Sequence, residues 1–317
     1  MANKIPQFPH FKRLGLEDQA EIDQFTRKFS PYSDFNFASL WCYDARGDHA
    51  FAFLHGNLVV RLRDYLSGEV IFSFLGNKDI PVTVRALSDY AASLGLHSAI
   101  RLVPEDVVAS CSDLLRKDFN LIEEEDGFDY IHDAANLAAL DLPEFAGKRK
   151  AIARLRRDRP GIEVRSLDLS CETIQQLVMQ LCETWRERKQ RDRRDFATER
   201  IAIELAVNHS ASFQFVSVGA FIDGEMAGFT INEPIHDGFY MAHFGKCDPA
   251  IRGMSELLES ETARLMLTHG CRWMNFQQDL GLPGLRQYKR AWMPNRFLRK
   301  FSISLPCHNG TARHVLS

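Results

Sequence analysis

The chain has 317 residues, a formal net charge of -3, 45% hydrophobic residues and 26% charged residues. Because one hydrophobic core usually stops growing at about 250 to 300 residues, we expect two domains. No apolar run reaches the roughly 18 to 20 residues that cross a bilayer, and the N-terminal residues lack the apolar centre of a signal peptide. We therefore expect a cytoplasmic protein without membrane insertion.

The first half of the chain is predicted to mix helices and strands. Two β-rich segments flank the turn at His55 and Gly56, which indicates a hairpin. Gly95 is placed to end a helix in the left-handed conformation. The expected elements are a helix (17–29), the hairpin (50–62), a strand (70–76), a helix (82–94), a strand (97–103), a helical stretch (107–115) and a β-like segment (119–132).

A basic block, GKRKAIARLRRDRPG at residues 147–161, separates the two halves of the chain. With seven basic residues and one acid it carries a net +6, so the rest of the chain carries -9. If the block is helical, Lys150, Arg154 and Arg157 share one face, and they could either bind an anion or remain solvated. A second charged run, residues 186–194, makes a phosphate-rich partner more plausible.

The second half of the chain repeats the order of the first. An amphipathic helix precedes a hairpin about Asp223 and Gly224, and Gly270 is placed like Gly95. The expected elements are a helix (176–185), the hairpin (217–231), a strand (238–245), a helix (254–269), a strand (271–277), a helical stretch (284–292) and a β-like segment (297–305).

The repeated order resembles the GNAT (acyl-CoA N-acyltransferase) fold, in which a mixed sheet opens where its fourth and fifth strands part. We therefore predict an α/β (α+β) chain built as a tandem duplication of GNAT-like domains, each with a mixed, mostly antiparallel sheet flanked by helices. Residues 1–139 would form a structural N-terminal copy. Residues 140–317 would contain the basic linker helix and the C-terminal copy, which would carry the site.

Residues 275–301, NFQQDLGLPGLRQYKRAWMPNRFLRKF, are the most distinctive stretch. They resemble the soluble C-terminal region of the phosphatidylglycerol lysyltransferase family, in which a polar strand end is followed by Asp-Leu-Gly, Gly-Leu-Arg and a Lys. Residues 33–44, SDFNFASLWCYD, resemble an N-terminal signature of the same proteins, and the basic block resembles their inter-domain helix and, distantly, the Fem-type aminoacyltransferases. Where the family often has acidic residues, this chain has Gln277 and Gln278.

The resemblance implies an aminoacyl- or acyltransferase that transfers its acyl group directly to an amine or hydroxyl acceptor in a cleft between the copies. The donor would be aminoacyl-tRNA or acetyl-coenzyme A, and the acceptor a small molecule or a peptide amine. No lipid lysylation is implied, because the membrane-embedded portion of the lysyltransferases is not in this sequence. Two alternatives stay open: an acetyl-coenzyme A dependent N-acetyltransferase, and an inert GNAT-like module that binds a nucleotide, peptide or tRNA.

The candidate catalytic residues lie at the end of the predicted strand 271–277 and on the helix after it. Asp279 would orient or deprotonate the nucleophile, or else cap the next helix. Lys289 and Arg286 would hold a phosphate or the oxyanion, and Tyr288 would reprotonate the leaving group. Asn275 belongs to the polar end of the strand.

Further candidates lie on the preceding strand and on the loop before helix 254–269. Tyr240 and His243 are expected to point to one face of their strand and line the cleft, although a structural role is the alternative for His243. Arg252 and Gly253 supply half of the glycine-rich signature that lets a helix N-terminus bind the diphosphate of coenzyme A. Nucleophilic catalysis by Ser or Cys has no motif, since G-x-S-x-G is missing.

Overall fold

The computed structural model describes residues 5–190 and 193–306. These residues form two compact units, and each unit is built from separate stretches of the chain. The larger unit contains residues 13–49 and 126–298, and the smaller unit contains residues 5–12, 50–125 and 299–306.

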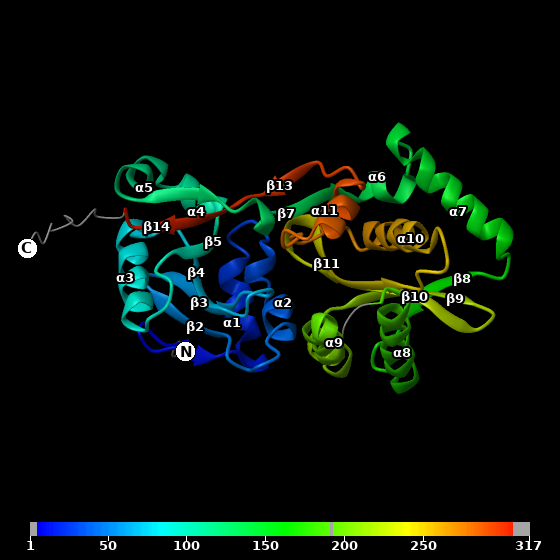
Figure 1. Cartoon of the computed structure of the whole chain (residues 1–317), viewed down its shortest axis with the longest axis horizontal. Helices are drawn as coiled ribbons and strands as arrows, with labels where there is room; N and C mark the ends of the chain where they lie inside the picture. Colours follow the sequence, from blue (N-terminus) through cyan, green and yellow to red (C-terminus); the bar gives the residue numbers. More distant parts are fainter. Residues whose placement is uncertain (1–4, 191–192, 307–317) are drawn as a thin grey trace, which may run out of the picture. The chain divides into compact units, whose positions relative to one another are not determined.

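The first half of the chain follows the predicted order of elements (Figure 1). His55 and Gly56 both have positive φ, at 52° and 80°, as a tight hairpin turn requires. The elements are β1 (Lys12–Arg13), α1 (Gln19–Thr26), α2 (Phe37–Cys42), β2 (Ala50–Leu54), β3 (Asn57–Arg63), β4 (Val70–Leu75), α3 (Ile80–Ser93), β5 (Ile100–Pro104), α4 (Glu105–Ala109), α5 (Ser112–Asp118), β6 (Asn120–Glu123) and β7 (Asp129–Asp133).

The second half repeats this order and adds three elements that the sequence pattern did not predict, α6, β8 and α9. The elements are α6 (Ala134–Ala139), α7 (Ala146–Asp158), β8 (Glu163–Leu167), α8 (Glu172–Arg188), α9 (Arg193–Asn208), β9 (Val216–Ile222), β10 (Glu225–Pro234), β11 (Phe239–Cys247), α10 (Met254–Thr268), β12 (Trp273–Asn275), α11 (Pro283–Arg290), β13 (Arg296–Leu298) and β14 (Lys300–Ser304).

The described residues form three sheets. One has the order β1-β2-β3-β4, a second the order β5-β14-β6, and the seven-stranded sheet the order β13-β7-β12-β11-β10-β9-β8. Most pairs are antiparallel, whereas β11 and β12 pair in parallel over three residues and then part. The prediction of a tandem GNAT-like α/β fold with mixed, mostly antiparallel sheets is confirmed.

Each half contributes one strand to a sheet of the other half. Strand β7 comes from the first half and lies between β12 and β13, whereas β14 comes from the second half and lies between β5 and β6. The two β-like segments predicted at 119–132 and 297–305 are therefore each divided between two sheets. The compact units group residues by packing, and their limits do not coincide with the predicted division at residue 139. The boundary between the two repeats at residue 139 stays a prediction.

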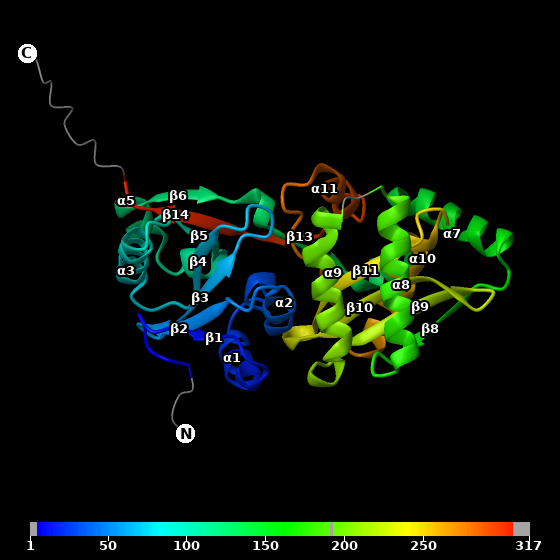
Figure 2. The ribbon, with the colours of Figure 1, turned by 60° about the horizontal axis from the view of Figure 1, so that its bottom comes forward.

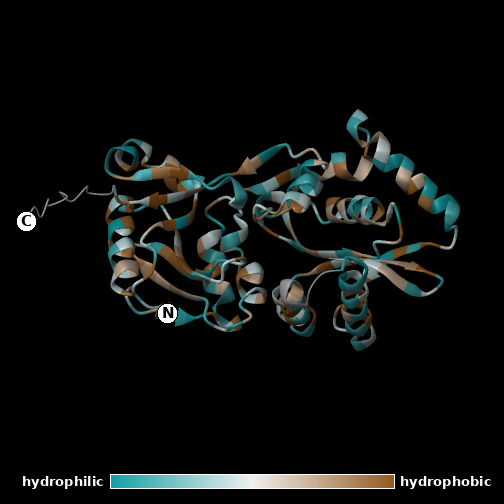
Figure 3. Cartoon of the chain, in the orientation of Figure 1, coloured by the Kyte–Doolittle hydropathy of each residue, from teal (hydrophilic) through white to brown (hydrophobic). Residues whose placement is uncertain are grey.

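Helices cover both faces of the seven-stranded sheet. In Figure 1, α10 lies on one side of β9, β10 and β11, and α8 and α9 lie on the other. Figure 2 shows α8 and α9 side by side across these strands. Buried apolar residues of α8 and α9 pack on one face, including Val178, Leu181 and Ile203, whereas Leu257 and Met266 of α10 belong to the clusters on the other face. Figure 3 colours the strands mostly as hydrophobic and the C-terminal end of α7 as hydrophilic.

Candidate functional site

The two stretches that carry the family resemblance meet inside the larger unit. Asp129 of β7 accepts hydrogen bonds from the backbone N–H and hydroxyl of Ser33, at 2.8 and 2.6 Å, and from Nδ2 of Asn275 at 3.3 Å. Nδ2 of Asn275 also donates to the carbonyl of Pro31 at 2.8 Å. Asp129 and Asn275 are completely buried. The predicted site residue Asn275 therefore holds residues 31–33 against the end of β12.

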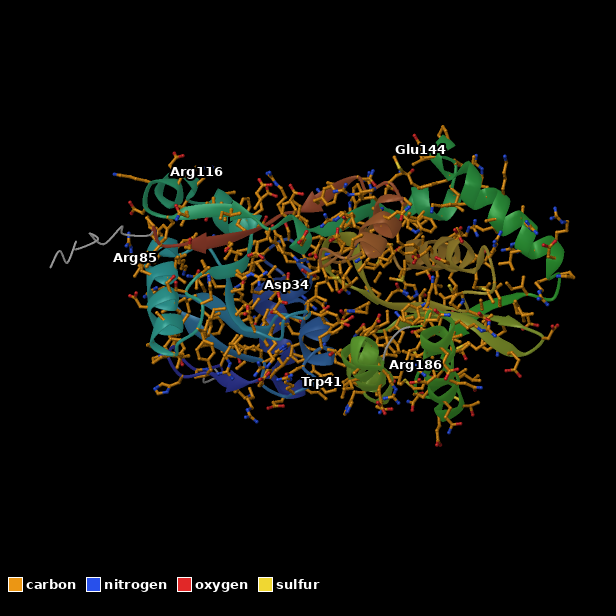
Figure 4. All side chains as sticks on the ribbon, in the orientation of Figure 1. Asp34, Trp41, Arg85, Arg116, Glu144 and Arg186 are labelled. Atoms are coloured by element: carbon orange, nitrogen blue, oxygen red, sulfur yellow. The ribbon has the colours of Figure 1, made fainter. Side chains whose placement is uncertain are left out.

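The two glutamines that precede Asp279, Gln277 and Gln278, both act as amide donors. Nε2 of Gln277 donates to the carbonyl of Ala242 at 2.9 Å, and Nε2 of Gln278 donates to Oδ1 of Asp34 at 3.1 Å. Figure 4 labels Asp34, which lies just before α2. The pairing of β11 with β12 ends at Met241. Beyond that point the Gln277 amide bonds the carbonyl of the next residue of β11, Ala242, which β12 no longer pairs. A carboxylate could not donate to either acceptor, so these contacts favour glutamine over glutamate.

Asp279 is 1% exposed and is surrounded by donors. It accepts from the Tyr130 hydroxyl at 2.5 Å, from the Gly281 N–H at 2.8 Å, and from Nε and Nη2 of Arg286 at 2.8 and 3.0 Å. Burial acts to raise the pKa of Asp279, but these donors outweigh it and hold the pKa below its usual value. The carboxylate thus stabilises the turn between β12 and α11, and α11 itself begins after Leu282.

Two other predicted residues of α11 are also engaged by protein groups. Lys289 is buried, and its ammonium donates to the carbonyls of Phe276 and Gln278, which fixes the chain beyond β12. Arg286 bonds Asp279 and also Asp126, and these carboxylates raise its pKa. Arg286 thus pairs with Asp279, whereas Lys289 bonds backbone carbonyls of the same loop, and both sets of contacts brace that loop.

The third predicted residue of α11, Tyr288, faces α10. Its hydroxyl lies 2.8 Å from the Ser255 hydroxyl and donates to Glu259 at 3.0 Å. Burial raises the pKa of Glu259 to about 7, and burial together with Glu259 raises the pKa of Tyr288 well above its usual value. Lys148 of α7 stacks over the Trp292 ring at 3.9 Å, and burial lowers its pKa.

Helix α7 covers the backbone that was predicted to bind coenzyme A. Gly253 is the N-cap of α10 with φ of 87°, and a Cβ atom there would lie 2.6 Å from the carbonyl oxygen of Ala151. Leu155 of α7 is buried in the same cluster as Met254 and Leu257. A diphosphate needs open space beside the N–H groups of this helix end, and here the carbonyl oxygen of Ala151, itself an acceptor, lies directly against Gly253. The residues therefore do not fit coenzyme A at α10; Arg252 beside them is exposed.

The basic face predicted for residues 147–161 exists. Lys150, Arg154 and Arg157 are exposed on α7, and the two arginines share Asp158 at 3.2 and 3.3 Å. The second charged run includes Arg191 and Asp192, which lie outside the described residues. Its residue Arg186, labelled in Figure 4, pairs with Glu183 at 2.9 Å.

Tyr240 and His243 do not share a face, so that prediction is wrong. They are three positions apart, and successive side chains alternate along a strand. Tyr240 is completely buried with Met266 and Trp292 on the α10 side. His243 instead bonds Glu233 through Nε2 at 3.2 Å and approaches the Ser39 hydroxyl through Nδ1 at 3.4 Å.

Comparison with known proteins agrees with these findings. The family model "Phosphatidylglycerol lysyltransferase, C-terminal" matches residues 26–304. The chain belongs to this family. Within the described ranges, no helix combines the length and the apolar character needed to span a membrane.

Two solved structures share the fold. A conserved protein of unknown function from Bacteroides thetaiotaomicron is 24% identical, with a TM-score of 0.81 over 93% of this chain and 99% of that one. The C-terminal domain of a putative lysylphosphatidylglycerol synthetase from Agrobacterium fabrum is 14% identical, with a TM-score of 0.62 over 92% of each chain. No curated protein matches the chain in sequence.

Several residues of the site escaped the sequence patterns. Asp129 and Tyr130 lie in a segment that was read only as β-like, and Asn36, Ser39 and Glu233 had no assigned role. The one signal that could have pointed to Asn36 and Ser39 is that both belong to the signature at residues 33–44.

Proposed function

We propose that this protein is an aminoacyltransferase that takes its acyl group from aminoacyl-tRNA and transfers it directly to an amine or hydroxyl acceptor. The observation that carries the proposal is the close contact of Ala151 with Gly253, which covers the N-terminus of α10. Because that position does not fit a diphosphate, the acyl donor must be held elsewhere, and the acetyl-coenzyme A alternative loses its binding site.

The exposed basic face of α7 supports a polyanionic donor. Lys150, Arg154 and Arg157 project from one helix in a chain whose remainder is acidic, so tRNA phosphates would be attracted to this face. Each neutralised phosphate releases counterions, so binding should weaken steeply with salt. Membership in the phosphatidylglycerol lysyltransferase C-terminal family agrees with aminoacyl transfer, and such a donor agrees with the predicted cytoplasmic location.

The test is consumption of the donor. The protein is incubated with bulk tRNA charged with a mixture of radiolabelled amino acids, with and without a set of amine acceptors, and ester loss is followed at low and moderate salt. A parallel reaction contains labelled acetyl-coenzyme A. We expect protein-dependent loss of the aminoacyl ester and no use of acetyl-coenzyme A; the reverse result would establish the N-acetyltransferase alternative.

A charge-reversal variant tests the role of α7. Replacing Lys150, Arg154 and Arg157 by Glu should abolish tRNA binding and leave the melting temperature nearly unchanged, because all three side chains are exposed. The matched control reverses three exposed basic residues of the smaller unit, Arg85, Arg116 and Lys117. Binding that survives the α7 reversal would contradict the proposal. Binding without any ester loss would favour the inert module.

A further inference from the structure

A polar cluster in the larger unit connects α2 to the ends of β10 and β11. Nε2 of His243 lies 3.2 Å from Oε2 of Glu233, and Nδ1 lies 3.4 Å from the hydroxyl of Ser39. Asn36 braces both ends of this chain of contacts. Its Nδ2 donates to Oε2 of Glu233 at 2.8 Å, and its Oδ1 accepts the N–H of Ser39 at 2.8 Å.

His243 is shielded from water. Its side chain is 1% exposed and that of Glu233 is 9% exposed. The ring of Phe215 meets the imidazole edge to face at 5.5 Å, and Phe244 lies 6.1 Å away. Both ring nitrogens face protein groups, so a substrate cannot touch the imidazole itself. The neutral group at Nδ1 is the hydroxyl of Ser39, a residue that is 7% exposed.

The backbone aims His243 at this cluster. Ile231 of β10 pairs with Phe244 and the next residue, Asn232, pairs with Ala242, so His243 is the extra residue of a β-bulge. Bulges re-aim side chains and are over-represented beside active sites. This bulge lies next to Ala242, where β11 and β12 part and where Gln277 bonds the open edge.

We propose that Ser39, His243 and Glu233 form a proton relay for acyl transfer. The nucleophilic atom of the acceptor bonds to the acyl carbon of the donor ester while its proton passes to Oγ of Ser39. The hydroxyl proton of Ser39 passes to Nδ1 of His243, and Glu233 stabilises the imidazolium. When the tetrahedral intermediate collapses, the bond to the ribose oxygen breaks and the proton returns to that oxygen by the same path.

The acidic end of the relay lies close to a second carboxyl group. Burial, together with the charge of Glu233, raises the pKa of Asp23 in α1 to about 6, whereas Arg27 just after the helix acts to lower it. Asp23 and Arg27 also line a hollow of about 610 Å³ with residues 211–214. Glu233 is thus the carboxylate that contacts His243, whereas Ser39 and Asn36 are neutral.

The first test needs no activity and therefore does not depend on the proposed function. The relay requires neutral His243 to carry its proton on Nε2, so that Nδ1 can accept from Ser39. Imidazole nitrogen shifts of the ¹⁵N-labelled protein, assigned by comparison with His243→Gln, report this tautomer. We expect the Nε2–H form in the wild type and loss of that preference in Glu233→Gln. A proton on Nδ1 in the wild type would overturn the relay.

The second test rests on the proposed function and uses the donor-consumption assay. Ser39→Ala should lower the rate by about 100-fold or more, the contribution typical of a positioned acid or base, and Ser39→Thr should restore most of it because the hydroxyl is kept. Glu233→Gln should also shift the pH at which the rate rises. Ser88→Ala is the matched control, since it removes a buried hydroxyl of the smaller unit and should change nothing.

The outcomes separate the two proposals. An active wild type whose Ser39→Ala variant is folded and equally fast would overturn the relay and leave aminoacyl transfer intact. A wild type that consumes no donor contradicts the proposed function, and the tautomer then decides the relay by itself.

Discussion

At the scale of single residues, Asp279 is a buried carboxylate that is fully occupied by hydrogen-bond donors. Four hydrogen bonds from Tyr130, Gly281 and Arg286 keep it ionised, and a base with a lowered pKa and no open lone pair has little capacity to accept another proton. Loss of turnover in an Asp279 variant would therefore be ambiguous, because the loop itself should loosen.

Asp279→Asn should destabilise the protein by about 1 to 3 kcal/mol, since an NH₂ group replaces one buried acceptor oxygen and leaves the donors around it unsatisfied. The measurement is urea denaturation at pH 7. Asp126→Asn is the matched control. It removes the other partner of Arg286, but its side chain is 68% exposed, so the expected loss is below about 1 kcal/mol. If both variants lost the same stability, burial of the Asp279–Arg286 pair would contribute nothing beyond the exposed Asp126–Arg286 pair.

The same pair predicts a pH dependence. Because the folded pKa of Asp279 is lowered, its contribution to stability is present above the unfolded pKa and is lost as the pH falls through the folded pKa. The difference in unfolding free energy between wild type and Asp279→Asn should therefore shrink below about pH 4.

At the scale of elements, the position of α7 on α10 depends on one glycine. Gly253 has φ of 87° and faces the Ala151 carbonyl. A side chain there would cost free energy twice, because it would strain the left-handed backbone and because its Cβ atom would clash with the carbonyl oxygen. We expect α7 to shift when residue 253 gains a Cβ atom, because the opposing atom belongs to a helix backbone and cannot move alone.

Gly253→Ala should therefore lower the free energy of unfolding by more than the strain of the left-handed backbone alone. The clash with the Ala151 carbonyl should add about 1 to 3 kcal/mol. Gly224→Ala is a close control: its φ is 86° and no atom lies within 4 Å of the added Cβ. Thermal or urea unfolding of both variants measures the difference. If the two substitutions cost the same, α7 does not press on this turn, and the reason for excluding coenzyme A weakens.

Elements with local signals could be predicted from the sequence. The hairpins at Gly56 and Gly224 and the helix ends at Gly95 and Gly270 follow from residues whose positive φ favours glycine. Helix α9 was missed because a charged run precedes it, and β8 because it is short and mostly exposed. The β-bulge in β11 could not be predicted, since it depends on the partner strand.

The site was less predictable than the fold because its contacts are long-range. Ser39 and His243 are 204 positions apart, and Ser33 and Asp129 are 96 apart. The local sequence around each of these residues does not indicate which distant residue it contacts. The resemblance to a family marked residues 33–44 and 275–301 as special, whereas only the folded chain shows that Asp129 and Gln278 connect them.

At the scale of the whole molecule, the exchanged strands make each half depend on the other. Strand β14 is the middle strand between β5 and β6, and it comes from the far end of the chain. Ser302 pairs with Ile122 of β6, so Ser302→Pro should remove a backbone donor from this central strand and cost about 1 to 3 kcal/mol. Ser302→Ala keeps the backbone donor and serves as the control.

Hydrogen exchange is the readout. Amides of β5 and β6 should lose protection in Ser302→Pro before those of β9 and β10, which belong to a different sheet. Loss of protection at β9 and β10 to the same extent would mean that the two units unfold as one.

The strand exchange also bears on how such a protein could be divided. A polypeptide of residues 1–139 would carry β7 without its partners β12 and β13, and a polypeptide of residues 140–317 would carry β14 without β5 and β6. Each fragment would expose unpaired strand edges, which favour association. The two fragments should therefore associate when they are produced together, because each supplies the strand that the other lacks. We expect them to complement each other and restore the folded protein.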